Sequence, residues 1–166
     1  KATFAERILH EKGFPDVKFM PFLLDIEKYR VFTPEEKLEV RNQYGLDEDT
    51  LIFSMVFRNQ GRKRPLQILE ALKNFQTNNP DRKAKALFVT NPFDEGGWTF
   101  PGPIRDLGLD NNDVLFAYIC HTCDSSSLKP FSQEPLHCEN CRTHNSCRPI
   151  SITKGISEDD LLKVYN

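Results

Sequence analysis

The sequence predicts an α/β fold: a Rossmann-like parallel sheet with flanking helices, plus a small zinc-ribbon-like insertion. Two observations carry this prediction. Apolar runs of strand length alternate with segments of helical spacing, an order typical of parallel βαβ units. All five cysteines fall within residues 120–147, in an arrangement that contains two pairs with metal-ligand spacing. This clustering indicates a separate, metal-bound element.

The length and composition agree with one folded domain, either alone or with a small appendage. The 166 residues include 22 Lys+Arg and 24 Asp+Glu, a net charge of −2, and 39% are apolar. Near-balanced charge argues against a surface built to neutralise nucleic-acid phosphates. No apolar run reaches the roughly 20 residues of a transmembrane segment, and no secretory leader follows Lys1. Cysteines confined to one stretch favour a reducing, cytoplasmic location.

Residues 1–33 are predicted to form a helix followed by a linker. Thr3 is the expected N-cap of a helix over residues 3–13, and Gly13 is expected to end it in the left-handed conformation. Residues 16–22 have the composition of an extended segment. This part is therefore set apart from the domain that follows.

The α/β domain begins with a helix that has clear end signals. Thr33 is the expected N-cap and Glu36 its capping-box partner, with Pro34 as the first helical residue. Gly45 is expected to end the helix. Since charged residues dominate it, most of this helix should face water.

Three apolar runs are predicted to be the parallel strands. The run at residues 51–57 is nearly continuous, which is typical of a strand buried on both faces, and runs at 84–90 and 114–119 follow it. Between the first two, apolar residues of the segment 68–75 recur at helical spacing. A short helical turn is expected at residues 104–107.

The chain after the cysteines is predicted to return to the domain. Residues 150–153 are a candidate fourth strand, and Ser157 is expected to cap a last helix. The Rossmann-like domain would then comprise residues 34–119 and 148–166. The zinc-ribbon-like insertion of residues 120–147 interrupts it.

The insertion contains the strongest functional signal. Two CxxC pairs, separated by 14 residues, are formed by Cys120, Cys123, Cys138 and Cys141. Two such pairs supply the four thiolates of a tetrahedral zinc ion, which leaves no open position for catalysis. The sequence therefore predicts a structural Zn²⁺ whose binding orders a polar loop.

Some questions about this site stay open at the level of sequence. Free thiols or a redox pair are the alternatives to a metal site. The insertion also holds spare donors that could replace one cysteine: Cys147, His121, His137 and His144. Each histidine is expected to be an exposed loop residue and not a ligand.

A basic loop follows the first predicted strand. Residues 58–64 contain four cations and no acid, and a helix follows. Open α/β sheets bind ligands at the carboxyl ends of their strands, and a helix start favours phosphate. Arg58 could bind a phosphate through two nitrogens, and Lys63 as a point charge. The alternative is a solvated basic turn, since the P-loop and dinucleotide-binding patterns are both missing.

The remaining polar segments indicate no catalytic group. Residues 94–98 are expected to be a mobile loop in which Trp98 packs locally, although a loop at this strand end could touch a ligand. The acidic run 158–160 is charge at a helix start. No serine or cysteine nucleophile with a base emerges, so no catalytic residue is assigned.

Three stretches of the chain have motifs of a known enzyme family. Residues 16–34 contain an extended run that leads into a Phe-x-Pro turn, and residues 41–46 have the pattern R-x-x-x-G-L before an apolar strand. Residues 155–166 begin with Gly-Ile-Ser and continue with a leucine and a tyrosine. In these stretches the chain resembles the retaining glycosyltransferases of family four, which have the two-lobed GT-B fold.

The resemblance gives the basic loop a role. Arg58 and Lys63 have the spacing of the family's G-R-x-x-x-x-K motif, with Phe57 in the place of glycine. It implies that these cations bind the diphosphate of a nucleotide-sugar donor (a UDP-, GDP- or ADP-sugar). They would stabilise it as a leaving group in place of a catalytic metal. The acceptor of the hexose is not implied.

The resemblance also implies partners. Residues 1–33 correspond to the interlobe helix and linker, and residues 34–119 with 148–166 to the first half of the C-terminal, donor-binding lobe. The N-terminal lobe and the remainder of the C-terminal lobe, with its E-x(7)-E motif, are expected as partners. The chain alone is therefore predicted to lack transferase activity.

Two other function classes are open alternatives. A zinc ribbon on an α/β scaffold could be a non-catalytic module that binds protein or nucleic acid. Residues 120–147 contain two basic residues against three acidic ones, which argues against nucleic acid. A receiver-like regulatory domain would need an acidic cluster at the end of its first strand, which the sequence lacks.

Overall fold

The computed structural model of the chain describes residues 2–18 and 25–166. They belong to two units, Lys1–Val31 and Phe32–Asn166. Within the described residues, no helix combines the length and the apolar character that a bilayer crossing requires.

The first unit contains helix α1 (Ala2–Glu11), followed by Gly13 with φ of +89°. The predicted left-handed exit at Gly13 is confirmed. The predicted N-cap at Thr3 is wrong, since the helix already includes Ala2. The observed start of a helix often differs from the predicted one by a residue or two, because the N–H groups of the first turn have no intrahelical partners. The extended segment predicted over residues 16–22 lies in part outside the described residues.

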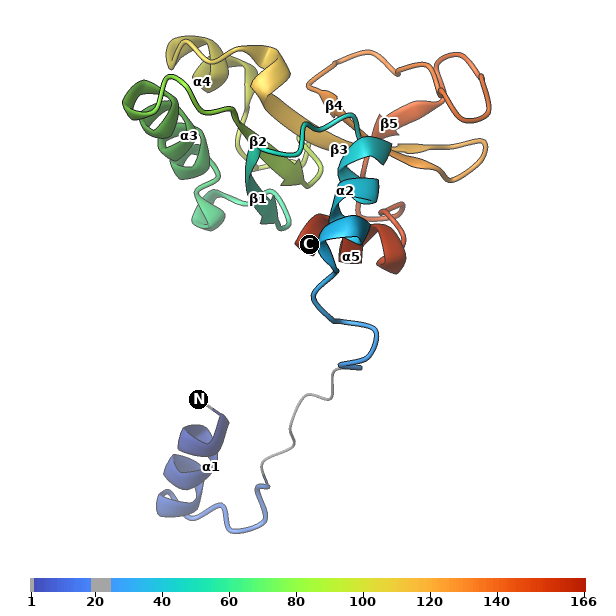
Figure 1. Ribbon diagram of the computed structural model, residues 1–166. Coiled ribbons are helices and arrows are strands. Elements are labelled where there is room, and N and C mark those ends of the chain that lie inside the picture. Colours follow the sequence, from blue (N-terminus) through green and yellow to red (C-terminus); the bar gives the residue numbers. More distant parts are fainter. Residues whose placement is uncertain (1, 19–24) are drawn as a thin grey trace. The chain divides into compact units, whose positions relative to one another are not determined.

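The second unit is built on one five-stranded sheet of order β1-β2-β3-β4, with β5 also paired to β3 (Figure 1). The strands are β1 (Leu51–Val56), β2 (Ala84–Val89), β3 (Val114–Cys120), β4 (Ser126–Pro130) and β5 (Cys147–Pro149). The pairs β1–β2 and β2–β3 are parallel, as predicted, whereas β4 and β5 run antiparallel to β3.

Strand β3 belongs both to the parallel part of the sheet and to the zinc-ribbon-like insertion, which is called the ribbon below. Strand β4 pairs with β3 along residues 115–119 and occupies one edge. Strand β2 pairs with residues 114–116 and β5 with residues 118–120, so these two share the other edge in succession. The cysteine-rich insertion is therefore a continuation of the sheet beyond the end of β2.

Helices cover both faces of the sheet (Figure 1). They are α2 (Pro34–Gln43), α3 (Leu66–Asn78), α4 (Pro101–Asp106) and α5 (Glu158–Tyr165), with the 3₁₀ turns η1 (Gly61–Lys63) and η2 (Asn111–Asp113). Helices α3 and α4 contribute to one apolar cluster, and α5 with the chain after α2 to a second one. The predicted α/β architecture with flanking helices is confirmed.

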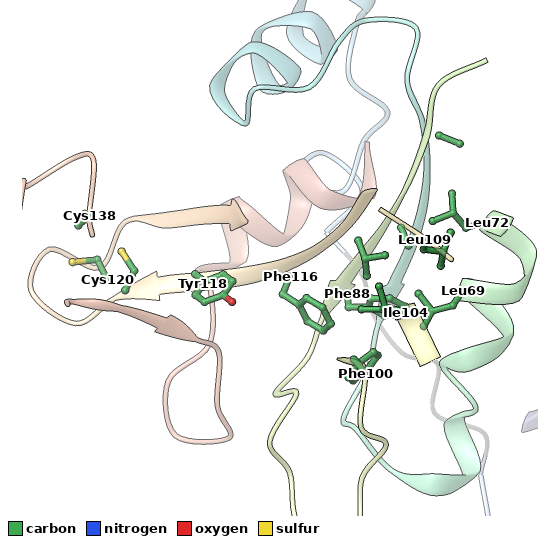
Figure 2. Packing of buried hydrophobic residues seen from close by; sticks show 14 residues of the cluster. Leu69, Leu72, Phe88, Phe100, Ile104, Leu109, Phe116, Tyr118, Cys120 and Cys138 are labelled. Carbon is green, nitrogen blue, oxygen red and sulfur yellow. The ribbon is translucent and has the colours of Figure 1, made fainter. Parts of the chain in front are cut away.

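The two clusters are separated by the alternation of β3. Val114, Phe116 and Tyr118 belong to the cluster of α3 and α4, and this cluster continues into Cys120 and Cys138 (Figure 2). The intervening residues of β3 belong to the second cluster. Because successive side chains of a strand point to opposite faces, one fully buried strand supplies both layers. All seven residues of β3 are buried.

The predicted helix caps of this unit are confirmed. The Thr33 Oγ1 accepts a hydrogen bond from the Glu36 amide (3.3 Å), and the Glu36 carboxylate accepts one from the Thr33 amide (2.8 Å). Gly45 ends this helix with φ of +65°. The Ser157 Oγ accepts a hydrogen bond from the Asp160 amide (3.1 Å) at the start of α5.

The prediction that residues 51–57 are buried on both faces is wrong. None of the residues of β1 is fully buried, and Leu51 and Val56 are each 38% exposed. In the described part of the chain β1 has β2 as its one neighbour, and it is the edge strand of the sheet. An apolar run does not indicate whether its strand lies in the middle or at the edge of the sheet.

The predicted fourth strand at residues 150–153 is also wrong. Strand β5 precedes it, and the chain turns after Ile150, where the Ser151 amide donates to the Lys154 carbonyl (2.8 Å). Ile150 is buried, but Ile152 is 68% exposed. The serine-rich β4, which looked like a loop, is a strand because the buried β3 offers it a row of backbone partners.

Candidate metal centre and anion-binding loop

The ribbon brings together the four cysteines that the sequence singles out. The Sγ atoms of Cys120, Cys123, Cys138 and Cys141 all lie within 4.8 Å of one another. The Cys120–Cys141 and Cys123–Cys138 sulfur pairs are each 3.7 Å apart. Zn–S bonds of about 2.3 Å in a tetrahedron separate the sulfurs by about 3.8 Å. The donor set and its spacing therefore fit a zinc ion.

Each cysteine pair lies on a tight turn of the same kind. The residue after the second cysteine is left-handed in both turns, with φ of +57° at Asp124 and +59° at Arg142. In the first turn, the Asp124 amide donates to the Cys120 carbonyl (3.1 Å), and the Thr122 amide to the Cys120 Sγ (3.3 Å). A non-glycine residue adopts this conformation at a cost, which the surrounding contacts must offset.

Hydroxyl groups surround the sulfurs. The Ser125 Oγ lies 3.2 Å from the Cys123 Sγ and 3.4 Å from the Cys138 Sγ. The Thr143 Oγ1 lies 3.2 Å from the Cys141 Sγ. Such groups orient and tune metal ligands. The sequence analysis did not identify Ser125 or Thr143. Each is the second residue after a CxxC pair, so the repeated pattern C-x-x-C-x-[ST] could have indicated them.

The surroundings of the first pair favour thiolates. Burial raises the pKa of Cys120, but its hydrogen bonds with the Ser146 hydroxyl and with the Thr122 and Cys123 amides outweigh it and lower this pKa to about 5. The Ser125 hydroxyl and amide lower the pKa of Cys123 to about 7. A metal ion binds the thiolate form of cysteine. The lowered pKa values of Cys120 and Cys123 therefore favour metal binding.

The spare donors lie outside the four-sulfur group. Cys147 is 3% exposed and lies opposite Cys120 in the register of β3 and β5. Burial raises the pKa of Cys147 to about 12. The three histidines, His121, His137 and His144, are exposed, as predicted. Among the described residues, the cluster of possible metal ligands contains the four paired cysteines and none of these donors.

The two cations of the basic loop have separate surroundings. Arg58 follows the carboxyl end of β1; its side chain is 59% exposed, and its Nε lies 3.5 Å from the Asp94 Oδ2. Lys63 is the last residue of η1 and is exposed to solvent. The structure thus keeps both cations on the loop between β1 and α3, and pairs Arg58 with an acid that the sequence did not indicate.

A buried amide ties the basic loop to residues 94–98. Asn59 is 1% exposed; its Oδ1 accepts a hydrogen bond from the Trp98 amide (2.9 Å), and its Nδ2 donates one to the Trp98 carbonyl (3.0 Å). The Trp98 Nε1 donates to the Gly61 carbonyl (3.0 Å). Trp98 therefore binds the basic loop. The sequence had predicted instead that Trp98 packs within its own mobile loop.

The close approach of these loops depends on Gly97. A Cβ at this position would lie 2.6 Å from the Asn59 Nδ2 and 2.9 Å from the Asn59 carbonyl oxygen. We expect Gly97→Ala to lower the free energy of unfolding by about 1–3 kcal/mol, as overpacked sites do. Urea unfolding measures this loss. Gly102→Ala is the control, because nothing lies within 4 Å of a Cβ there; equal losses at both positions would contradict the expectation.

Two clefts lie away from the basic loop. The larger, of about 530 Å³, is lined mainly by polar residues from the end of α2, from β4 and from the second cysteine pair. The smaller, of about 240 Å³, lies between α2, β1 and α5. Neither is lined by Arg58 or Lys63.

No protein-family model, curated protein or solved structure matches this chain. The assignments that follow therefore depend on the chain's own residues.

Proposed function

We propose that this chain is part of the donor-binding lobe of a GT-B glycosyltransferase and binds the diphosphate of a nucleotide sugar, for transfer of a hexose to an acceptor. The observation that carries the proposal is the loop after β1. It contains Arg58 and Lys63 at the family's spacing, and it leaves the carboxyl end of a strand in a parallel sheet. Open α/β sheets bind their ligands at the carboxyl ends of their strands.

The chemistry of the loop suits an anionic leaving group. The Arg58 Nε lies 3.5 Å from the Asp94 Oδ2, and no hydrogen bond to a described residue occupies the two terminal nitrogens, which can bind two phosphate oxygens together. Lys63 adds a compact charge five residues further along the chain. Positive charge fixed where a diphosphate departs lowers the barrier to glycosyl transfer.

The metal has a structural role in this proposal. Cys120, Cys123, Cys138 and Cys141 would hold one Zn²⁺ with all four positions filled. When bound, the ion supplies a cross-link between the two turns of the ribbon. It offers no open position to a substrate, so the transfer chemistry belongs to the basic loop.

A second candidate function is a non-catalytic binding module. The observation that favours it is the 530 Å³ cleft between the end of α2 and the ribbon. Lys129, the one lysine or arginine of its lining, forms an ion pair with Glu139 (2.5 Å). The cleft therefore suits a polar protein segment better than a nucleic acid.

Titration of the ¹⁵N-labelled chain with UDP, GDP and ADP tests the proposal. We expect one of them to shift the amide signals of residues 58–66. Arg58→Ala should weaken this binding by about tenfold, the effect of losing one charge-assisted contact, and Arg58→Ala with Lys63→Ala should abolish it. Arg105→Ala is the matched control, because Arg105 is an exposed cation that is likewise paired to an acid, Asp106.

Two results would contradict the proposal. If none of the nucleotides moves the signals of the basic loop, the chain does not bind a donor diphosphate through it. If the shifts gather at β4 and the second cysteine pair, the ligand lies in the 530 Å³ cleft, and the binding module is the better description.

A further inference from the structure

We propose that Asp94 is a positioning residue for the anion-binding loop: its buried carboxylate holds Arg58 through Nε and leaves the terminal nitrogens for the ligand. The nature of the ligand rests on the proposed function. The positioning itself is a property of the free chain, so the two can be tested separately.

The burial of the two partners is unequal. The Asp94 side chain is 9% exposed, whereas that of Arg58 is 59% exposed. The Asp94 Oδ2 is fully buried and, within the described residues, accepts no hydrogen bond; the Arg58 Nε at 3.5 Å is its charged partner. A buried carboxylate is costly without a nearby cation. Separation of the pair therefore costs more free energy at the buried carboxylate than at the exposed guanidinium.

The backbone around Asp94 is held in place. The Asn91 Oδ1 accepts a hydrogen bond from the Phe93 amide (3.0 Å), and the Asn91 Nδ2 donates to the Asp94 Oδ1 (3.4 Å). The Asp94 carbonyl accepts from the Gly97 amide (3.0 Å). These contacts form a compact turn directly after β2, with the carboxylate directed into the protein.

The backbone around Arg58 is fixed to the same turn. Asn59, the next residue, makes the two hydrogen bonds to Trp98, and Gly97 allows the close approach. Three cross-loop hydrogen bonds thus set the distance between the backbone of Arg58 and that of Asp94. The two backbone segments that carry the ion pair are therefore fixed relative to each other.

Such an arrangement raises the affinity for an anion by reducing the entropy lost on binding. A free arginine side chain populates many rotamers, and part of this entropy is lost when it binds a phosphate. Holding Nε in advance removes some of this loss. The opposing effect is that Asp94 neutralises Arg58 and repels the ligand; that alternative predicts tighter binding when the acid is neutralised.

The test compares Asp94→Asn with Glu95→Gln, which removes the same charge from the adjacent, exposed acid. The first readout is the mobility of the Arg58 Nε–H group in the free chain, measured by ¹⁵N relaxation. We expect restricted motion in the wild type and in Glu95→Gln, and free motion in Asp94→Asn. The second readout is nucleotide affinity, which we expect to fall about tenfold in Asp94→Asn and to stay unchanged in Glu95→Gln.

Asp94→Glu keeps the charge but moves the carboxylate, and it tests the same contact if Asp94→Asn folds poorly; we expect it also to lower the affinity. Arg58→Lys removes Nε together with the two terminal nitrogens, so adding Asp94→Asn to it should cost no further affinity, as for two residues that act as a unit. Unchanged mobility at Nε, or equal or tighter nucleotide binding in Asp94→Asn, would overturn the positioning role. Altered mobility with no nucleotide binding in the wild type would uphold it and overturn the proposed function.

Discussion

Cys138→Ser is expected to abolish zinc binding and to lower the unfolding temperature of the chain by roughly 10 °C or more. Cys138 is one of the four sulfurs of the cluster, and three ligands hold zinc far less tightly than four. A ligand present at a thousand times its dissociation constant stabilises a fold by about 4 kcal/mol, which is lost with it. In a domain of this size that loss corresponds to roughly 10–15 °C. Metal analysis and calorimetry measure the two effects.

The effect should extend beyond the ribbon. Cys120 and Cys138 belong to the same apolar cluster as Tyr118 and Phe116, and Figure 2 shows the cysteines at one end of this row of side chains. The Tyr118 hydroxyl also donates to the Pro130 carbonyl (3.1 Å) at the end of β4. Loss of the metal therefore loosens the core of the domain as well as the two turns. Chelation of the wild type should have the same result.

Cys147→Ala is the matched control for this experiment. Cys147 is buried beside the cluster but is not one of its four sulfurs, so this variant should retain about one zinc per chain. Loss of zinc in Cys147→Ala with full retention in Cys138→Ser would show that Cys147 is the fourth ligand. Two CxxC pairs that react fully with a thiol reagent, with no chelator present, would contradict a metal site altogether.

Phe116→Ala is expected to lower the free energy of unfolding by about 3–5 kcal/mol, the usual cost of emptying a buried phenylalanine site. Phe116 is 0% exposed, and its ring centroid lies 4.9 Å from that of Phe100, 5.4 Å from Phe88 and 5.7 Å from Phe131. The last of these contacts joins the sheet to the chain that follows β4. Urea unfolding at constant zinc concentration measures the loss.

Phe93→Ala serves as the comparison for Phe116→Ala. Phe93 is 52% exposed, and a ring contact with Phe131 at 5.5 Å is its aromatic neighbour. We expect it to cost about 1 kcal/mol or less, because most of its surface stays in water. If both variants lose the same amount, the aromatic cluster around Phe116 is not the centre of the fold.

Local and periodic signals determined much of this protein without a structure. The three parallel strands, the helices between them and the caps at Thr33 and Ser157 depend on residues that are neighbours in sequence or that repeat at a fixed spacing. The four zinc-type cysteines were also identifiable, because each pair occupies one short turn. Two such pairs at the ends of one insertion need only a hairpin to meet.

Contacts between distant segments were decided by the tertiary structure alone. The pairing of the serine-rich β4 with β3, and the place of β1 at the edge of the sheet, depend on which neighbour a strand finds and not on its own composition. Arg58 meets Asp94, and Asn59 meets Trp98, across more than thirty residues of chain. No periodicity links such positions, because the folding of β1 and β2 side by side is what brings their following loops together.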